Sequence, residues 1–82
     1  MDGSHSLLIS DRRRALELLA SSREGVSEAL MIAHGFTVPQ MVELVRSGLA
    51  SATPERVVVG NRAMQITRLR ITDAGRKALA GP

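Results

Sequence analysis

The seven residues from 34 to 40 restrict the fold of this 82-residue chain more than any other segment. A helix predicted over Glu28–His34, with Ser27 as its N-cap, must stop at Gly35, because glycine adopts the left-handed conformation that closes helices. Thr37 and Gln40 then have the spacing of a capping box, so a new helix is predicted to begin directly after Thr37. Two short helices joined by only three residues are typical of a helix-turn-helix.

Local signals also bound this next helix, which we predict over residues 38–47. Pro39 lies in its first turn, where a missing N–H costs nothing, and Gly48 is predicted to end it. Leu49 is then placed to fold back on Leu44. Four apolar residues are predicted to form the inward face of this helix: Val38, Met41, Val42 and Val45.

The segment before the junction is predicted to hold one further helix, from Asp11 to about Ser21, with Ser10 as its N-cap. Apolar residues recur along it at helical spacing. The predicted inward stripe is Ala15, Leu16, Leu19 and Ala20. Val26, which follows a turn, is expected to form a one-residue bridge or a short strand.

After Gly48 the pattern changes from helical to strand-like. Gly60-Asn61 separates two runs rich in β-branched residues, which is a signal for a two-residue hairpin loop. We therefore predict strands at Glu55–Val59 and Arg62–Ile71. Pro54 should mark an edge strand, a bulge or the start of a strand, because proline cannot donate to a sheet ladder.

The second predicted strand does not alternate cleanly between apolar and polar residues. Its apolar residues change parity near Thr67, which predicts a bulge or a change of buried face there. Thr72 is then the expected cap of a short last helix from Asp73 to about Ala80. Gly75 weakens this helix intrinsically, so packing must hold it.

Composition limits the class of protein. Apolar residues make up 44% of the chain, enough for one thin core, and the only aromatic residue is Phe36. The chain contains no cysteine, which excludes disulfides and thiolate metal sites. Its longest early apolar run, Leu7-Leu8-Ile9, is too short for a signal peptide or a membrane span. We expect a cytoplasmic protein with a flexible tail at residues 1–8 and one domain at residues 9–82.

The segment from Val42 to Leu79 resembles the winged-helix core of bacterial MarR-type transcription regulators. Residues 44–50, Leu-Val-Arg-Ser-Gly-Leu-Ala, resemble the end of that family's recognition helix, which closes on a Gly-Leu pair. Residues 71–76, Ile-Thr-Asp-Ala-Gly-Arg, resemble the start of the helix that follows its wing. With the helix-turn-helix, the resemblance extends over residues 10–80.

The resemblance implies an α+β winged helix-turn-helix with a three-helix core, a two-stranded β-hairpin wing and a short C-terminal helix. It makes Val38–Ser47 the recognition helix. MarR-type regulators also have terminal helices that form a dimer and a ligand cleft, and this chain has no room for them. It equally resembles the short, uncharacterised bacterial winged-helix proteins.

Double-stranded DNA is the partner that the resemblance implies, with the recognition helix in the major groove. Gln40 can pair with adenine, and Arg46 with guanine or a phosphate. The net charge of +3 and the four arginines of the hairpin favour the same partner. The predicted DNA-binding residues are Gln40, Arg46, Ser47, Arg56, Arg62, Arg68 and Arg70.

Purely structural roles are the alternative for these residues. The capping box can occupy Gln40, and Glu43 can pair with Arg46 one helical turn away. The hairpin arginines can form a solvated outer face whose stems cover thin apolar surface.

Two functions therefore stay open. The first is a DNA-binding module, a small transcriptional regulator or accessory factor. The second is a protein-interaction module or homodimer on the same fold. No nucleophilic triad, paired carboxylates or phosphate-binding loop can be assembled, and His34 has no second ligand at metal spacing. We expect no enzymatic activity, cofactor, metal site or small-molecule substrate.

Overall fold

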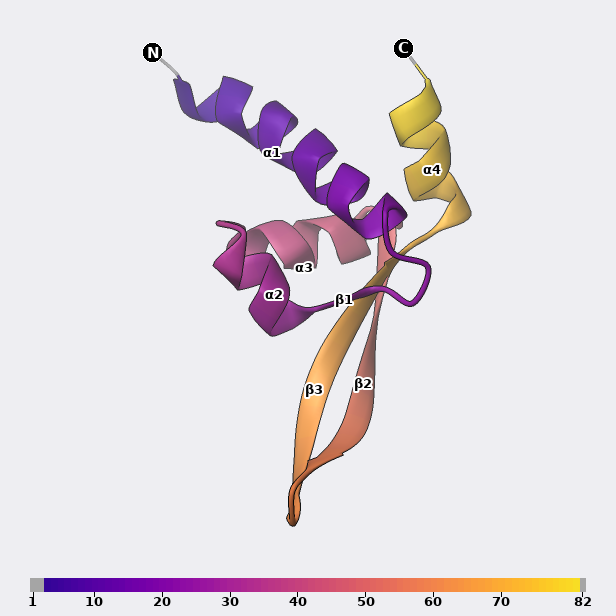
Figure 1. The fold of residues 1–82 in the computed structure, drawn as a ribbon. Helices are drawn as coiled ribbons and strands as arrows, with labels where there is room; N and C mark the ends of the chain where they lie inside the picture. Colours follow the sequence, from indigo (N-terminus) through magenta and orange to yellow (C-terminus); the bar gives the residue numbers. More distant parts are fainter. Residues whose placement is uncertain (1–2, 82) are drawn as a thin grey trace.

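The computed structural model describes residues 3–81 as an α+β fold of four helices and a three-stranded antiparallel sheet. The helices are α1 (Gly3–Ala20), α2 (Glu28–Ala33), α3 (Val38–Arg46) and α4 (Asp73–Ala80). The strands are β1 (Val26–Ser27), β2 (Ala50–Val59) and β3 (Arg62–Ile71). Figure 1 shows the helices gathered at one end of the molecule, from which β2 and β3 extend as a long hairpin.

The predicted stop and restart between α2 and α3 is confirmed. Gly35 has a φ of +98°, and the N–H of Phe36 donates to the carbonyl of Met31 at 3.1 Å, as in a Schellman motif. The Thr37 hydroxyl accepts from the N–H of Gln40 at 3.2 Å, while Gln40 Oε1 accepts from the N–H of Thr37 at 2.8 Å. These two bonds are the predicted capping box.

A second glycine stop joins the end of α3 to α4. Gly48 has a φ of +78°, and the N–H of Leu49 donates to the carbonyl of Leu44 at 2.9 Å. The Leu49 carbonyl in turn accepts from the N–H of Thr72 at 3.1 Å, and the Thr72 side chain caps α4 by accepting from Gly75. Gly75 lies against Leu49 and Ile71, and Leu79 packs on the core, so packing holds the glycine-weakened helix in place, as predicted.

Helix α1 begins at Gly3, well before the predicted start at Asp11. Ser10 lies inside the helix, so its prediction as an N-cap is wrong. Neither glycine nor proline stands between Ser4 and Ser10, and nothing in that segment stops a helix. Residues 1 and 2 of the predicted tail lie outside the described residues.

The sheet has the strand order β1-β3-β2, which places β3 in the middle. Its register with β2 is unbroken from Ala50↔Ile71 to Val59↔Arg62, so the predicted bulge near Thr67 is wrong. The other predicted alternative, a change of buried face, is compatible with this regular pairing. Strand β2 begins five residues before Glu55, its predicted start. Pro54 lies within this edge strand, as its missing N–H requires.

The core is small and lies between the helices and the base of the hairpin. It holds Ala15, Leu16, Leu19, Val26, Met31, Phe36, Met41, Leu44, Ala50 and Leu69. Only Ala50 and Leu69 of these come from the hairpin, and both lie near its helical end. The rest of the hairpin, residues 51–68, contributes no fully buried side chain.

Candidate functional site

Helix α3 faces the core differently from the sequence prediction. Met41 is buried as predicted, and the other buried residue of the helix is Leu44. Val42 is exposed, so the prediction that it faces inward is wrong. Val38 and Val45 are exposed as well, at 46% and 37%. The reason is local. Phe36, just before the Thr37 cap, and Met41 are placed to form a hydrophobic staple, and Leu44 makes the Schellman contact with Leu49. These two contacts fix which side of the helix meets the core.

The sequence already contained this signal. Phe36, Met41, Leu44 and Leu49 are the four positions that the two capping motifs draw inward, and three of them are buried and the fourth packs on the core. The three valines occupy the neighbouring stripe of the helix. They are the surface residues that sequence reasoning missed.

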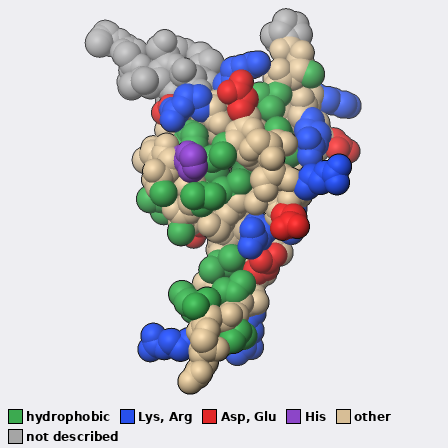
Figure 2. Space-filling view, in the orientation of Figure 1, with side chains coloured by type: hydrophobic (Ala, Val, Ile, Leu, Met, Phe, Trp, Pro, Cys, Tyr) green, Lys and Arg blue, Asp and Glu red, His purple; other side chains and the backbone are tan. Residues whose placement is uncertain are grey.

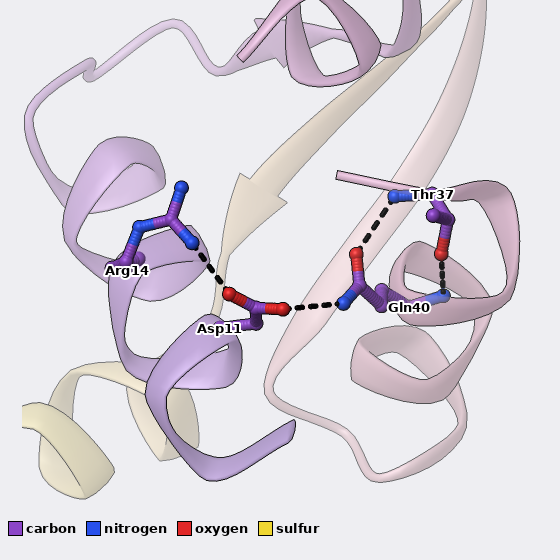
Figure 3. A network of polar contacts seen from close by, with 4 residues as sticks. All are labelled: Asp11, Arg14, Thr37 and Gln40. Atoms are coloured by element: carbon purple, nitrogen blue, oxygen red, sulfur yellow. Dashed lines mark hydrogen bonds and ion pairs between the residues drawn. The ribbon is translucent and has the colours of Figure 1, made fainter. Parts of the chain in front are cut away.

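Gln40 is half-buried, and its side chain is engaged in hydrogen bonds within the protein. Besides its two capping bonds, its side-chain Nε2 donates to Oδ2 of Asp11 on α1 at 2.9 Å. Figure 3 shows the resulting chain of contacts from Arg14 through Asp11 and Gln40 to Thr37. The amide that could read an adenine therefore fastens α1 to α3.

Ser47 and Arg46 lie at the other end of the helix and differ in availability. The Ser47 hydroxyl donates to the carbonyl of Glu43 at 2.7 Å, so it is used locally. Glu43 forms its ion pair with Arg12 of α1, at 3.9 Å, and not with Arg46. Arg46 is exposed, and no acidic partner for it lies among the described residues.

The four hairpin arginines divide into two pairs. Arg68 and Arg70 lie near the helical end, and both contact Glu55, at 2.9 and 3.8 Å. Arg56 and Arg62 lie nearer the tip, are exposed, and have no acidic partner in the described part of the chain. Their positions in the register differ by an odd number of pairs, so they lie on opposite faces of the hairpin.

A groove of about 250 Å³ runs between α3 and the base of the hairpin. It is lined by Glu28, Val38, Met41, Val42, Val45, Arg46, Ala52, Thr67 and Leu69. Arg56 lies on the same hairpin face as Ala52 and Thr67, two cross-strand pairs beyond Thr67. The groove thus has an apolar floor with two arginines and one glutamate near its ends.

Further exposed apolar residues lie outside the groove. Leu30 and Ile32 are about half exposed on α2, and Val58, Val59 and Met64 are exposed near the hairpin tip. Figure 2 shows hydrophobic side chains on both the helical body and the hairpin, with basic side chains between and beyond them. Because Arg56 and Arg62 lie on opposite faces of the hairpin and Arg68 and Arg70 contact Glu55, the arginines of α3 and the hairpin do not form one continuous positive surface.

A larger hollow of about 500 Å³ lies between α1 and α3. Its polar side chains satisfy one another, since Asp11 bonds to Gln40 and Arg12 pairs with Glu43. Such mutual pairing leaves no converging set of free polar groups of the kind that a small-molecule site needs.

No known protein family, curated protein or solved structure is significantly similar to this chain. None of the helices in the described residues is long and apolar enough to cross a lipid bilayer.

Proposed function

We propose that this protein is a protein-interaction module on a winged helix-turn-helix fold. The order of elements and the sheet order β1-β3-β2, with a long β2–β3 hairpin after the helix pair, support the winged-helix assignment. In that assignment α3 is the recognition helix and the hairpin is the wing. The partner is another protein, which lies along the groove between them.

The observation that carries this proposal is the apolar outer face of α3. Val38, Val42 and Val45 line a groove whose floor is also apolar. A DNA-reading helix instead turns polar side chains toward base edges and phosphates, and here Gln40 and Ser47 are bonded internally. Exposed apolar patches of this kind are typical of protein-binding surfaces.

The chemistry of the groove favours the apolar face of an acidic amphipathic helix as its occupant. The volume of about 250 Å³ lies below the range of about 300–1,000 Å³ typical of small-molecule sites, but it accepts aliphatic side chains. Arg46 lines the groove and Arg56 lies just beyond it, and together they outnumber the one acid, Glu28. Carboxylates flanking the apolar residues of the partner would complement these cations.

A library of displayed helical peptides, randomised at apolar and charged positions, tests this proposal. We expect selection on the intact protein to enrich Leu, Ile or Met at i, i+3 or i+4, and i+7, flanked by Asp or Glu. Val42→Lys should weaken binding of the enriched peptide at least about tenfold, because it places a cation on the apolar floor.

Val58→Lys is the matched control, because it makes the same change at an exposed valine outside the groove. It should leave the affinity for the peptide unchanged. Failure to enrich any peptide, enrichment of basic flanks, or equal binding by the Val42→Lys variant would each contradict the proposal.

DNA binding is a second candidate, favoured by a specific observation: Arg46, Arg56 and Arg62 are exposed and without acidic partners in the described residues. Three phosphate contacts predict a slope of about −2.7 in log K against log salt concentration. A random duplex titrated at several salt concentrations measures this slope. Arg62→Gln should reduce its magnitude by about 0.9, and absence of binding at low salt would exclude this function.

A further inference from the structure

The outer half of the hairpin is a two-stranded ribbon without a covering element. Strand β1 pairs with β3 only at Leu69 and Arg68, so the ribbon has no third strand beyond that point. None of the residues from 51 to 68 is fully buried. An isolated two-stranded ribbon is at best marginally stable in water, so this segment gains much from a further strand.

Both edges of the ribbon are free, and the edge formed by β2 has the composition of a pairing strand. Strand β2 is an edge strand, and Val57, Val58 and Val59 at its outer end are consecutive β-branched residues. Val58 and Val59 are 70% and 61% exposed. Pro54 protects the inner half of this edge, because it offers no N–H, but no proline or lysine protects the outer half.

We propose that a second copy of this chain pairs with that edge, antiparallel and centred on Val58, to form a four-stranded sheet across a two-fold axis. In this register Val57 lies opposite Val59 of the second copy, on one face of the new sheet. Within each chain Val57 already pairs with Met64. An apolar row from Met64 through Val57 therefore extends to Val59 of the second copy and ends at the Arg62 that pairs with it. The two-fold axis generates the same row a second time.

The charges of the edge select this register. Centred on Val58, the pairing places Arg56 opposite Gly60 of the second copy, so no two arginines face each other. A shift of two residues along the strand would centre the pairing on Arg56 and oppose two like charges, which destabilises a sheet. A shift the other way would centre it on Gly60, within the turn, and would lose the strand pairing.

Sedimentation equilibrium of the intact chain over a range of concentrations tests the dimer. The mass should rise from 8.8 kDa toward twice that value as concentration increases. Val58→Lys should keep the chain at 8.8 kDa over the same range, because two lysines would face each other at the two-fold axis. Because Val58 is exposed, the Val58→Lys variant should keep its fold, and circular dichroism checks this.

Val42→Lys is the matched control and should dimerise like the wild type, because Val42 lies in the groove. A wild-type mass that stays at 8.8 kDa up to about 1 mM chain would overturn the proposal. Dissociation caused by Val42→Lys but not by Val58→Lys would also overturn it, since the groove would then be the interface. The two proposals can fail separately, because Val58→Lys is expected to abolish the dimer and spare peptide binding, whereas Val42→Lys is expected to do the opposite.

A cross-link tests the register itself. The chain has no cysteine, so Val58→Cys introduces a single thiol, which lies opposite its own copy at a distance that a disulfide spans. Oxidation should convert this variant to a covalent dimer, whereas Val42→Cys should stay monomeric on a denaturing gel. If the wild type dimerises but the Val58→Cys variant does not form the cross-link, pairing at this edge is refuted.

Discussion

Gln40 makes three hydrogen bonds that serve the fold, two to Thr37 and one to Asp11. We expect Gln40→Ala to lower the free energy of unfolding by about 1–2 kcal/mol, because a capping bond and a partly buried side-chain bond are lost together. Urea denaturation measures this loss. Gln65→Ala, an exposed glutamine of β3, is the control and should change stability by less than about 0.5 kcal/mol. Equal stabilities of the two variants would contradict the structural role of Gln40.

Gly75 is required by space rather than by backbone conformation. A Cβ on this residue would lie 2.2 Å from the carbonyl oxygen of Leu49, so Gly75→Ala should cost about 1–3 kcal/mol although alanine favours helices. Gly60→Ala, where φ is +65° and nothing lies within 4 Å, isolates the conformational cost of about 1–2 kcal/mol. Thermal unfolding compares the two. A Gly75→Ala variant more stable than the wild type would show that α4 can move away from Leu49.

At the scale of elements, the orientation of α3 about its axis buries Met41 and exposes the adjacent Val42. Met41 is 5% exposed and Val42 is 46% exposed, so Met41→Ala should destabilise the fold by about 2–5 kcal/mol. Val42→Ala should change stability by less than about 1 kcal/mol, because its side chain is half in solvent. Chemical denaturation of both variants tests this orientation, and a larger loss at Val42 would contradict it.

For α3 the sequence predicted the helix ends better than the inward face, whereas for α1 the start was wrong and the predicted Ala15, Leu16 and Leu19 are buried. The reason is physical. Caps such as Thr37 and stops such as Gly35 and Gly48 act within five residues, so they can be read locally. Two apolar stripes compete on α3, and helical periodicity alone does not decide between them; the capping motifs at its two ends do so only when they are considered together. The early start of β2 was missed because its first residues, from Ala50, carry short side chains without clear alternation.

The candidate site shows the same division. Side-chain types predicted which residues could contact DNA, but not which of them the fold uses itself. Asp11 lies 29 residues from Gln40, and Glu55 lies 13 residues from Arg68, so neither bond follows from local spacing. The exposed valines of α3 follow from the caps only once both capping motifs are taken together.

At the scale of the whole molecule, we expect the helical body to be stable without the outer hairpin. Deleting residues 56–59 and 62–65, which keeps the Gly60-Asn61 turn and joins it to Glu55 and Ile66, should change the free energy of unfolding by less than about 1 kcal/mol. The deleted residues include no fully buried side chain. Circular dichroism and urea denaturation test this. Loss of cooperative unfolding would show that the ribbon supports the body.

The bond between Asp11 and Gln40 also has a consequence for signalling within the molecule. A ligand that required the Gln40 amide would first have to release the first helix from the third. Occupancy at one end of α3 and the position of α1 would then be thermodynamically linked, and anything that held α1 in place would oppose that ligand by the same factor. In a DNA-binding protein built this way, Asp11 would compete with the base for the Gln40 amide.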